Sequence, residues 1–156
     1  MDFKKIILSI LFSLSMSTLA YSNSISEVNT NNLLSMIANS KGQVVLVSFW
    51  ASWCPYCVKE IKELKTLRDK YNQNELKIIG VSFDLSKSHL IQILKKSKIN
   101  YPNYISADNS IGMVFGVMGV PATILYDKNG KIVKQFQGYV NCEEIDKIIQ
   151  KLLKSD

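Results

Sequence analysis

The stretch S-F-W-A-S-W-C-P-Y-C-V-K-E, residues 48–60, contains two of the three cysteines of the chain. It begins inside the run Val44–Trp50, which is almost entirely β-branched or aromatic and predicts a strand buried on both faces of a parallel sheet. It ends inside a second pattern, where apolar residues at 58, 61, 64, 67 and 71 recur at helical spacing. This pattern predicts a helix from Pro55 to about Tyr71. The cysteines therefore lie at a strand-to-helix junction.

The rest of the chain continues the alternation of strands and helices. Periodicity predicts strands over 76–83, 122–126 and 131–137, an extended piece around 104–105, and helices near 33–37, 88–98, 108–115 and 141–154. The turn D-K-N-G at 127–130 predicts a hairpin between the last two strands. Residues 21–32 are polar and predict a flexible lead-in. The pattern as a whole predicts an α/β fold with a central mixed sheet flanked by helices.

The N-terminus has the layout of a secretory signal. Lys4 and Lys5 precede an apolar run over 6–14, and small residues follow up to two suitable cleavage positions, Ala20 and Ser22. The apolar stretch is shorter than the roughly 20 residues that span a bilayer, which favours cleavage. We therefore expect a signal peptide over 1–22, a mature domain over 23–156 and a periplasmic location. An N-terminal segment that stays as a membrane anchor is the alternative.

Composition indicates an ordinary globular protein. At 156 residues and 47% hydrophobic content, the chain is long enough to bury a core in one domain. Its formal net charge is +6, and the lysines scatter along the sequence without forming a basic block. This distribution is typical of a solvated surface and argues against nucleic-acid binding.

Cys54 and Cys57 could serve as a structural staple, a metal site or a redox pair. A disulfide that closes a loop of about four residues removes only roughly 2 kcal/mol of unfolded-chain entropy. This stabilisation is near the bottom of the range for disulfides, which argues against a purely structural role. A zinc site would need Cys142 and His89, which lie on other predicted elements, and no second pair has finger-like spacing. A Cys-x-x-Cys pair beside a β-α-β pattern favours redox exchange, with no metal and a Cys54–Cys57 disulfide.

The order of residues assigns different roles to the two cysteines. Proline is favourable at the first position of a helix, so Pro55 places Cys54 at the N-cap. There its sulfur can accept hydrogen bonds from the amides of Tyr56 and Cys57 and faces the positive end of the helix dipole. The pKa of the Cys54 thiol should then fall below its free value of about 8.5. We predict that Cys54 is the nucleophile and that Cys57, one turn further in, resolves the mixed disulfide.

Glu60 is predicted to carry the proton of Cys57. At about 100° per residue it projects about 60° from Cys57, inside the apolar stripe between Leu64 and Leu67. A poorly solvated carboxylate has a raised pKa and can exchange a proton with an attacking thiol. The alternative is a glutamate at the edge of the stripe that reaches water.

The third cysteine, Cys142, falls in the first turn of the last predicted helix. We expect a free cysteine that is simply packed against the domain. The alternative is a thiol acidified by the helix N-terminus, with a third redox role or a mixed disulfide to a partner.

Taken together, the motifs resemble the thioredoxin superfamily, specifically the exported TlpA/ResA-like thiol–disulfide oxidoreductases. The matching pieces are F-W-A-S-W-C-P-Y-C-V-K-E, I-I-G-V-S-F-D, Y-P-N-Y and F-G-V-M-G-V-P-A-T-I-L-Y-D-K-N-G-K-I-V, which follow in order over nearly all of the chain beyond about residue 30. The resemblance implies a thioredoxin fold with an extra strand-helix unit between about Ser86 and Ser110. It implies no cofactor.

The resemblance also implies a substrate-binding surface. Pro121 would be a cis proline beside the cysteines, and the backbone of Val120 would pair with an extended segment of the substrate. Trp53, Pro55 and Tyr56 would complete this surface on the other side of the cysteine pair.

The activity that the resemblance implies is reduction of disulfides in other exported proteins. The protein would act as a monomer and would be recharged by a membrane electron donor of the DsbD or CcdA kind. A DsbA-like disulfide donor is the first alternative, and a non-catalytic binding or chaperone module is the second.

Two residues depart from the patterns of related proteins. Ser48 stands where thioredoxin has a buried aspartate, so Glu60 would replace that proton carrier. The resemblance leaves a role in cytochrome c maturation open, but Ala122 follows the proline where members with that role often carry glutamate, which counts against an apocytochrome substrate.

Overall fold

The computed structural model of the protein describes residues 25–108 and 110–155. The predicted signal peptide, its cleavage positions and the alternative membrane anchor all lie outside these residues. Every helix in the described ranges is too short or too polar to cross a membrane.

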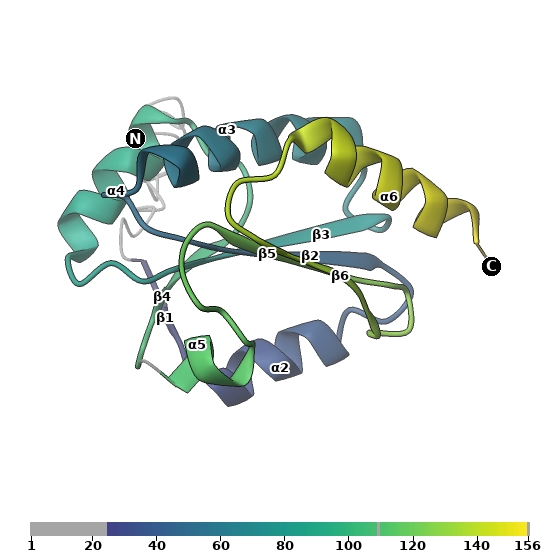
Figure 1. Ribbon diagram of the computed structural model, residues 1–156, viewed down its shortest axis with the longest axis horizontal. Helices are drawn as coiled ribbons and strands as arrows, with labels where there is room; N and C mark the ends of the chain where they lie inside the picture. The colour runs from purple at the N-terminus through teal and green to yellow at the C-terminus, as the bar shows by residue number, and fades with distance from the viewer. Residues whose placement is uncertain (1–24, 109, 156) are drawn as a thin grey trace, which may run out of the picture.

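The described residues form one mixed sheet of six strands, which runs through the centre of the domain (Figure 1). Its strands are β1 (Glu27–Val28), β2 (Val44–Trp50), β3 (Leu76–Ser82), β4 (Asn103–Ser106), β5 (Ala122–Tyr126) and β6 (Ile132–Gln137). Their spatial order is β1-β4-β3-β2-β5-β6. The first four are parallel, whereas β5 runs antiparallel to β2 and β6 antiparallel to β5.

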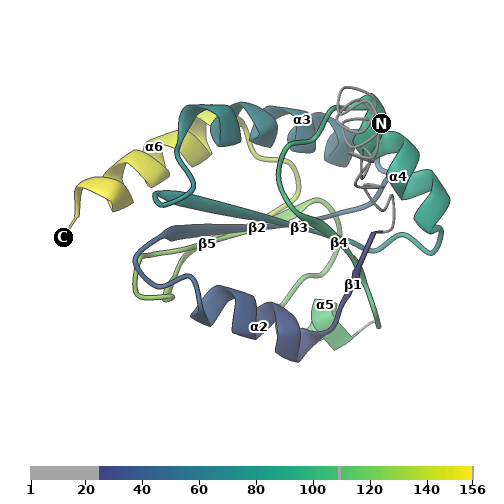
Figure 2. The same ribbon diagram turned by 180° about the vertical axis from the view of Figure 1, so that it is seen from behind.

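Helices cover both faces of this sheet. In Figures 1 and 2, α2 (Thr30–Ala38) and α5 (Ser110–Val114) lie on one face, and α3 (Pro55–Lys70), α4 (Lys87–Lys96) and α6 (Cys142–Lys154) lie on the other. This confirms the predicted α/β thioredoxin-like fold. The predicted extra unit is present as α4 followed by β4, and β4 adds to the sheet between β3 and β1.

The strand β2 divides its side chains between two cores because successive residues of a strand point to opposite faces. All seven of its residues are buried. Val47 and Phe49 pack in the cluster that includes Leu33 of α2, whereas Leu46 packs in the cluster that includes Leu64 of α3. A strand buried in this way holds its C-terminal end, and the cysteine loop that follows it, on a rigid support.

The predicted lead-in over 21–32 is wrong from Glu27 onward. Glu27 and Val28 pair in parallel with Ile105 and Ser106 of β4, and Val28 is fully buried. α2 then begins at Thr30, capped by the side chain of Asn29. A two-residue strand is too short to show a period, so its pairing with a segment far along the chain left no signal in the sequence.

Candidate active site

The cysteine loop is a tight turn between β2 and α3. The Cys54 amide donates to the Ala51 carbonyl oxygen at 3.2 Å and closes the turn. Cys54 has the extended backbone of an N-cap residue, and Pro55 is the first residue of α3. The Cys57 amide donates to Cys54 Sγ at 3.2 Å. The predicted N-cap is therefore confirmed, and of the two amides expected to bond the sulfur, the Cys57 amide does so.

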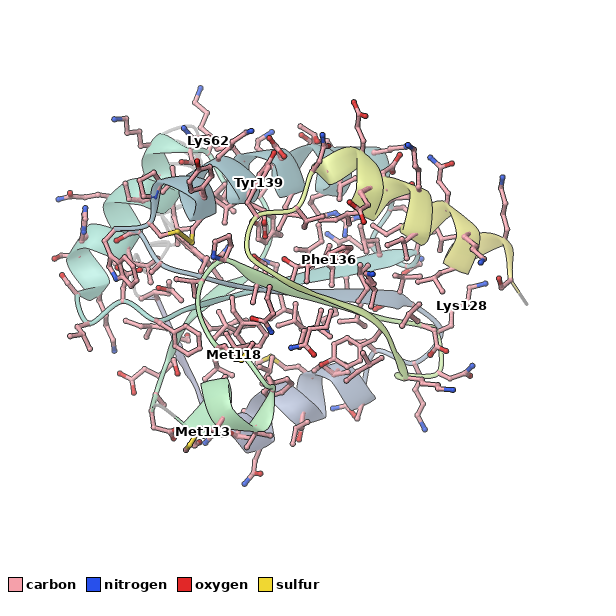
Figure 3. All side chains as sticks on the ribbon, in the orientation of Figure 1. Lys62, Met113, Met118, Lys128, Phe136 and Tyr139 are labelled. Carbon is pink, nitrogen blue, oxygen red and sulfur yellow. A yellow bond between two sulfur atoms is a disulfide. The ribbon has the colours of Figure 1, made fainter. Side chains whose placement is uncertain are left out.

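Cys54 and Cys57 form a disulfide, visible as the yellow sulfur–sulfur bond at the start of α3 in Figure 3. Their Cα atoms lie 5.2 Å apart. Cys54 is 8% exposed, whereas Cys57 is completely buried. A partner's sulfur can therefore reach Cys54 but cannot reach Cys57 without a rearrangement of the chain.

A cis peptide bond joins Val120 to Pro121, as the resemblance implied. The Val120 carbonyl oxygen lies 3.8 Å from Cys54 Sγ, so this segment, which directly precedes β5, passes beside the Cys54 sulfur. Val120 is half-buried and also packs against the apolar cluster that contains both cysteines.

Large aromatic side chains stand exposed around the disulfide. Trp53 is 65% exposed and Tyr56 is 66% exposed. The ring of Tyr56 lies 6.1 Å from that of Tyr139, and Lys59 Nζ lies 4.3 Å from the centre of the Tyr139 ring. Figure 3 shows Tyr139 beside α3. Exposed apolar surface of this kind commonly marks an interaction site.

Glu60 is buried beneath α3, with 1% of its surface exposed. Thr123 Oγ1 donates to its Oε1 at 2.8 Å, and the Val140 amide donates to its Oε2 at 3.2 Å. Burial raises the pKa of the Glu60 carboxyl above its ordinary 4.5, although both hydrogen bonds act in the opposite direction. The prediction of a poorly solvated carboxyl with a raised pKa is confirmed, and the alternative of a solvated glutamate is wrong.

The two hydrogen-bond partners of Glu60 escaped the sequence reasoning. Thr123 lies 63 residues away from it along the chain and Val140 lies 80 residues away. Only the packing of α3 against β5 and the segment after β6 brings these groups together. The threonine of the P-A-T motif was quoted as part of the resemblance, but no local pattern assigned it to Glu60.

A second polar cluster, centred on Asp84, holds the cysteine loop at Ser52. The buried carboxylate of Asp84, two residues after β3, accepts hydrogen bonds from the Ser52 amide at 2.8 Å, from Ser52 Oγ at 2.5 Å and from Ser82 Oγ at 2.5 Å. Ser52 Oγ also lies 3.1 Å from Nδ1 of His89, an exposed residue of α4. An acidic residue just past the end of a buried strand is the sequence signal that could have found this cluster.

Cys142 was predicted to be either a packed free cysteine or a thiol acidified by the helix N-terminus. It begins α6, half-buried against α3, and its Sγ donates to the Glu63 carbonyl oxygen at 3.3 Å. Burial raises the pKa of its thiol to about 11, so the suggestion of an acidified thiol is wrong. It is a free, packed cysteine.

No cluster of three or more His, Cys, Asp or Glu side chains that could hold a metal ion occurs within 25–108 and 110–155.

Comparisons with known proteins agree with this geometry. The family model described as Redoxin matches residues 19–152. The chain is 28% identical over 112 residues to the thiol-disulfide oxidoreductase ResA of Bacillus thuringiensis subsp. konkukian, covering 72% of this chain and 65% of that protein. It is 25% identical over 110 residues to ResA of Bacillus subtilis, covering 70% and 62%. The chain thus spans about two-thirds or less of the length of these curated relatives.

Solved structures share the fold at low sequence identity. A thiol-disulfide isomerase from Corynebacterium glutamicum superposes with a TM-score of 0.70 at 20% identity, over 76% of this chain and 85% of that one. StoA from Bacillus subtilis gives a TM-score of 0.61 at 23% identity, over 69% and 82%.

Proposed function

The chain belongs to the Redoxin family, and from this premise we propose that it is an exported thiol–disulfide oxidoreductase that reduces disulfides of other exported proteins. One observation supports this proposal above the others. The disulfide joins Cys54, which keeps 8% of its surface exposed, to Cys57, which is completely buried, and a buried carboxyl with a raised pKa follows one turn later. Exchange in two steps uses one thiol that attacks the substrate and a second that resolves the mixed disulfide, and a carboxyl beside the second thiol can take its proton.

In the first step the reduced protein attacks its substrate. The Cys54 thiolate, favoured by the N-terminus of α3, attacks one sulfur of a substrate disulfide. The substrate S–S bond breaks and an intermolecular Cys54–substrate disulfide forms. The leaving substrate sulfur takes up a proton from water.

In the second step Cys57 releases the substrate. Glu60 takes the proton of the Cys57 thiol, and the resulting thiolate attacks Cys54 Sγ. The Cys54–Cys57 bond forms, the intermolecular bond breaks, and the second substrate sulfur leaves as a thiol once protonated. The substrate gains two electrons and the protein loses two, so an electron donor must restore the dithiol.

The surface around Cys54 suits an extended polypeptide. The backbone of Val120 lies beside Cys54 Sγ. It would pair with an extended segment of the substrate next to Pro121. Trp53, Pro55 and Tyr56, all exposed, would contact the side chains of that strand. We propose a monomer that takes its electrons from a membrane donor of the DsbD or CcdA kind.

The direction of electron flow is tested by the reduction potential of the Cys54–Cys57 pair, measured by equilibration with glutathione buffers. A reductase should have a potential near that of thioredoxin, about −270 mV. A value near about −120 mV, typical of DsbA, would contradict the reductase and support a disulfide donor.

A further inference from the structure

A row of polar positions crosses the sheet beneath α3. The strand register places Thr123 of β5 opposite Ser48 of β2. On its other side Ser48 pairs with Gly80 of β3, and Gly80 pairs with Asn103 of β4. Residues in register on neighbouring strands point to the same face of the sheet. Because Thr123 bonds to Glu60 on α3, the whole row faces α3.

The polar side chains on either side of Ser48 in this row have hydrogen-bond partners. Thr123 Oγ1 donates to Glu60. In the side chain of Asn103, Oδ1 accepts a hydrogen bond from Trp50 Nε1 at 3.0 Å and Nδ2 donates to the Tyr101 carbonyl oxygen at 3.0 Å. A Cβ on Gly80 would collide with the Asn103 side chain, so glycine leaves the space that this amide fills.

Ser48 is the exception in this row. Its side chain is completely buried, and its Oγ is the one buried side-chain nitrogen or oxygen atom of the described ranges without a hydrogen-bond partner. Such orphans are rare because a buried hydroxyl without a partner destabilises the fold. Directly across from it on β5 stands the Thr123 hydroxyl, which already donates to Glu60 and could accept a hydrogen bond from Ser48.

We propose that Ser48 is a positioning residue of the proton-transfer site, whose hydroxyl turns to donate to Thr123 Oγ1 when Glu60 is ionised. The two Cβ atoms of an opposed antiparallel pair lie about 4.5–5.5 Å apart, so rotation of Ser48 about χ1 can bring its oxygen within reach. Thr123 Oγ1 donates its own hydrogen to Glu60 and keeps its lone pairs free to accept. The inference rests on the proposed function, and it assigns this residue to the same site.

We call the two consecutive hydrogen bonds from Ser48 to Thr123 and from Thr123 to Glu60 the relay. The relay favours the ionised form of the Glu60 carboxyl. In a chain of hydrogen bonds each donor polarises the next, which strengthens the bond from Thr123 to a charged Glu60 more than to a neutral one. The relay therefore opposes the effect of burial and keeps Glu60 able to accept the proton of Cys57. The other titratable groups around Glu60 are Glu63 of α3, Tyr101 before β4, Cys142 of α6 and, in the reduced protein, the Cys57 thiol one turn earlier on α3. Replacing Ser48 changes none of them.

The test is a carboxyl NMR titration of Glu60 in the reduced protein, without substrate. We expect Ser48→Ala to raise the pKa of Glu60 by about half a pH unit, roughly a threefold change in its acid constant, from the loss of one net hydrogen bond. The matched control is Ser40→Ala, which removes a buried hydroxyl bonded to Met36 far from Glu60, and it should leave the titration unchanged. In a Thr123→Val background, Ser48→Ala should have no further effect.

An unchanged or lowered pKa of Glu60 in Ser48→Ala, or the same increase with Thr123→Val present, would overturn the relay. A crystal structure of the reduced wild type above the pKa of Glu60 gives an independent readout. Ser48 Oγ should lie within 3.2 Å of Thr123 Oγ1 in it, a normal hydrogen-bond length, and a clear separation would also overturn the proposal. Neither measurement uses a substrate, so the proposal for Ser48 can be overturned without overturning disulfide exchange. Equally, disulfide exchange can be overturned without affecting the result for Ser48.

Discussion

Replacing Cys54 with serine is expected to lower the rate of insulin reduction by about a thousandfold or more. The hydroxyl of serine does not ionise near neutral pH, and Cys57 is too deeply buried to replace the lost nucleophile. The rate is measured with dithiothreitol as the electron donor. The matched control is Cys142→Ser, which removes a free cysteine that the proposed exchange does not use. It should keep the wild-type rate within about twofold, as changes away from named structural features usually do.

Retention of more than a tenth of the activity in Cys54→Ser would contradict the exchange mechanism. It would favour the alternative of a binding or chaperone module, in which the cysteines matter little. Loss of activity in Cys142→Ser would instead show that the packed thiol takes part.

The second large effect is expected from Glu60→Gln, which should slow the release of the mixed disulfide by about a hundredfold, within the usual range for loss of a general base. The acceptor of the Cys57 proton is the ionised carboxylate. Its population rises with pH through the pKa of Glu60, which burial holds above the ordinary 4.5. In the wild type the rate of release should therefore rise with pH across that pKa, and this rise should be absent from Glu60→Gln.

The measurement is the decay of a preformed Cys54–substrate disulfide, followed by stopped flow from pH 4 upward. Glu63→Gln is the matched control, since it removes a carboxyl from the same helix one turn away, and it should keep the rise. Identical pH–rate profiles for the wild type and Glu60→Gln would exclude Glu60 as the proton carrier.

Local patterns in the sequence predicted most of the fold and half of the site. β2 and α3 were predicted within a residue of their observed ends because burial on both faces and helical spacing leave a direct trace in composition. Pro55 fixed the helix start, and with it the N-cap position of Cys54. The buried setting of Glu60 followed from its angle on the same helix.

The parts that escaped prediction depend on contacts between distant segments. β1 consists of two residues, and within the part of the chain that the structure describes its strand partner is β4. Thr123 acquires its role from Glu60, which lies on another element. Ser48 was noticed as a departure from thioredoxin, but its unpaired hydroxyl and its place opposite Thr123 follow from strand register. Register is a property of the folded sheet that no single stretch of sequence contains.

In the proposed mechanism Cys54 is the sulfur that bonds to the substrate. This role is tested most directly by mixing the reduced Cys57→Ser variant with a disulfide-bonded protein and locating the trapped intermolecular disulfide by peptide mass spectrometry. We expect a stable adduct on Cys54, formed in high yield because the resolving thiol is absent. No adduct, or an adduct on Cys142 with Cys54 unmodified, would contradict this role.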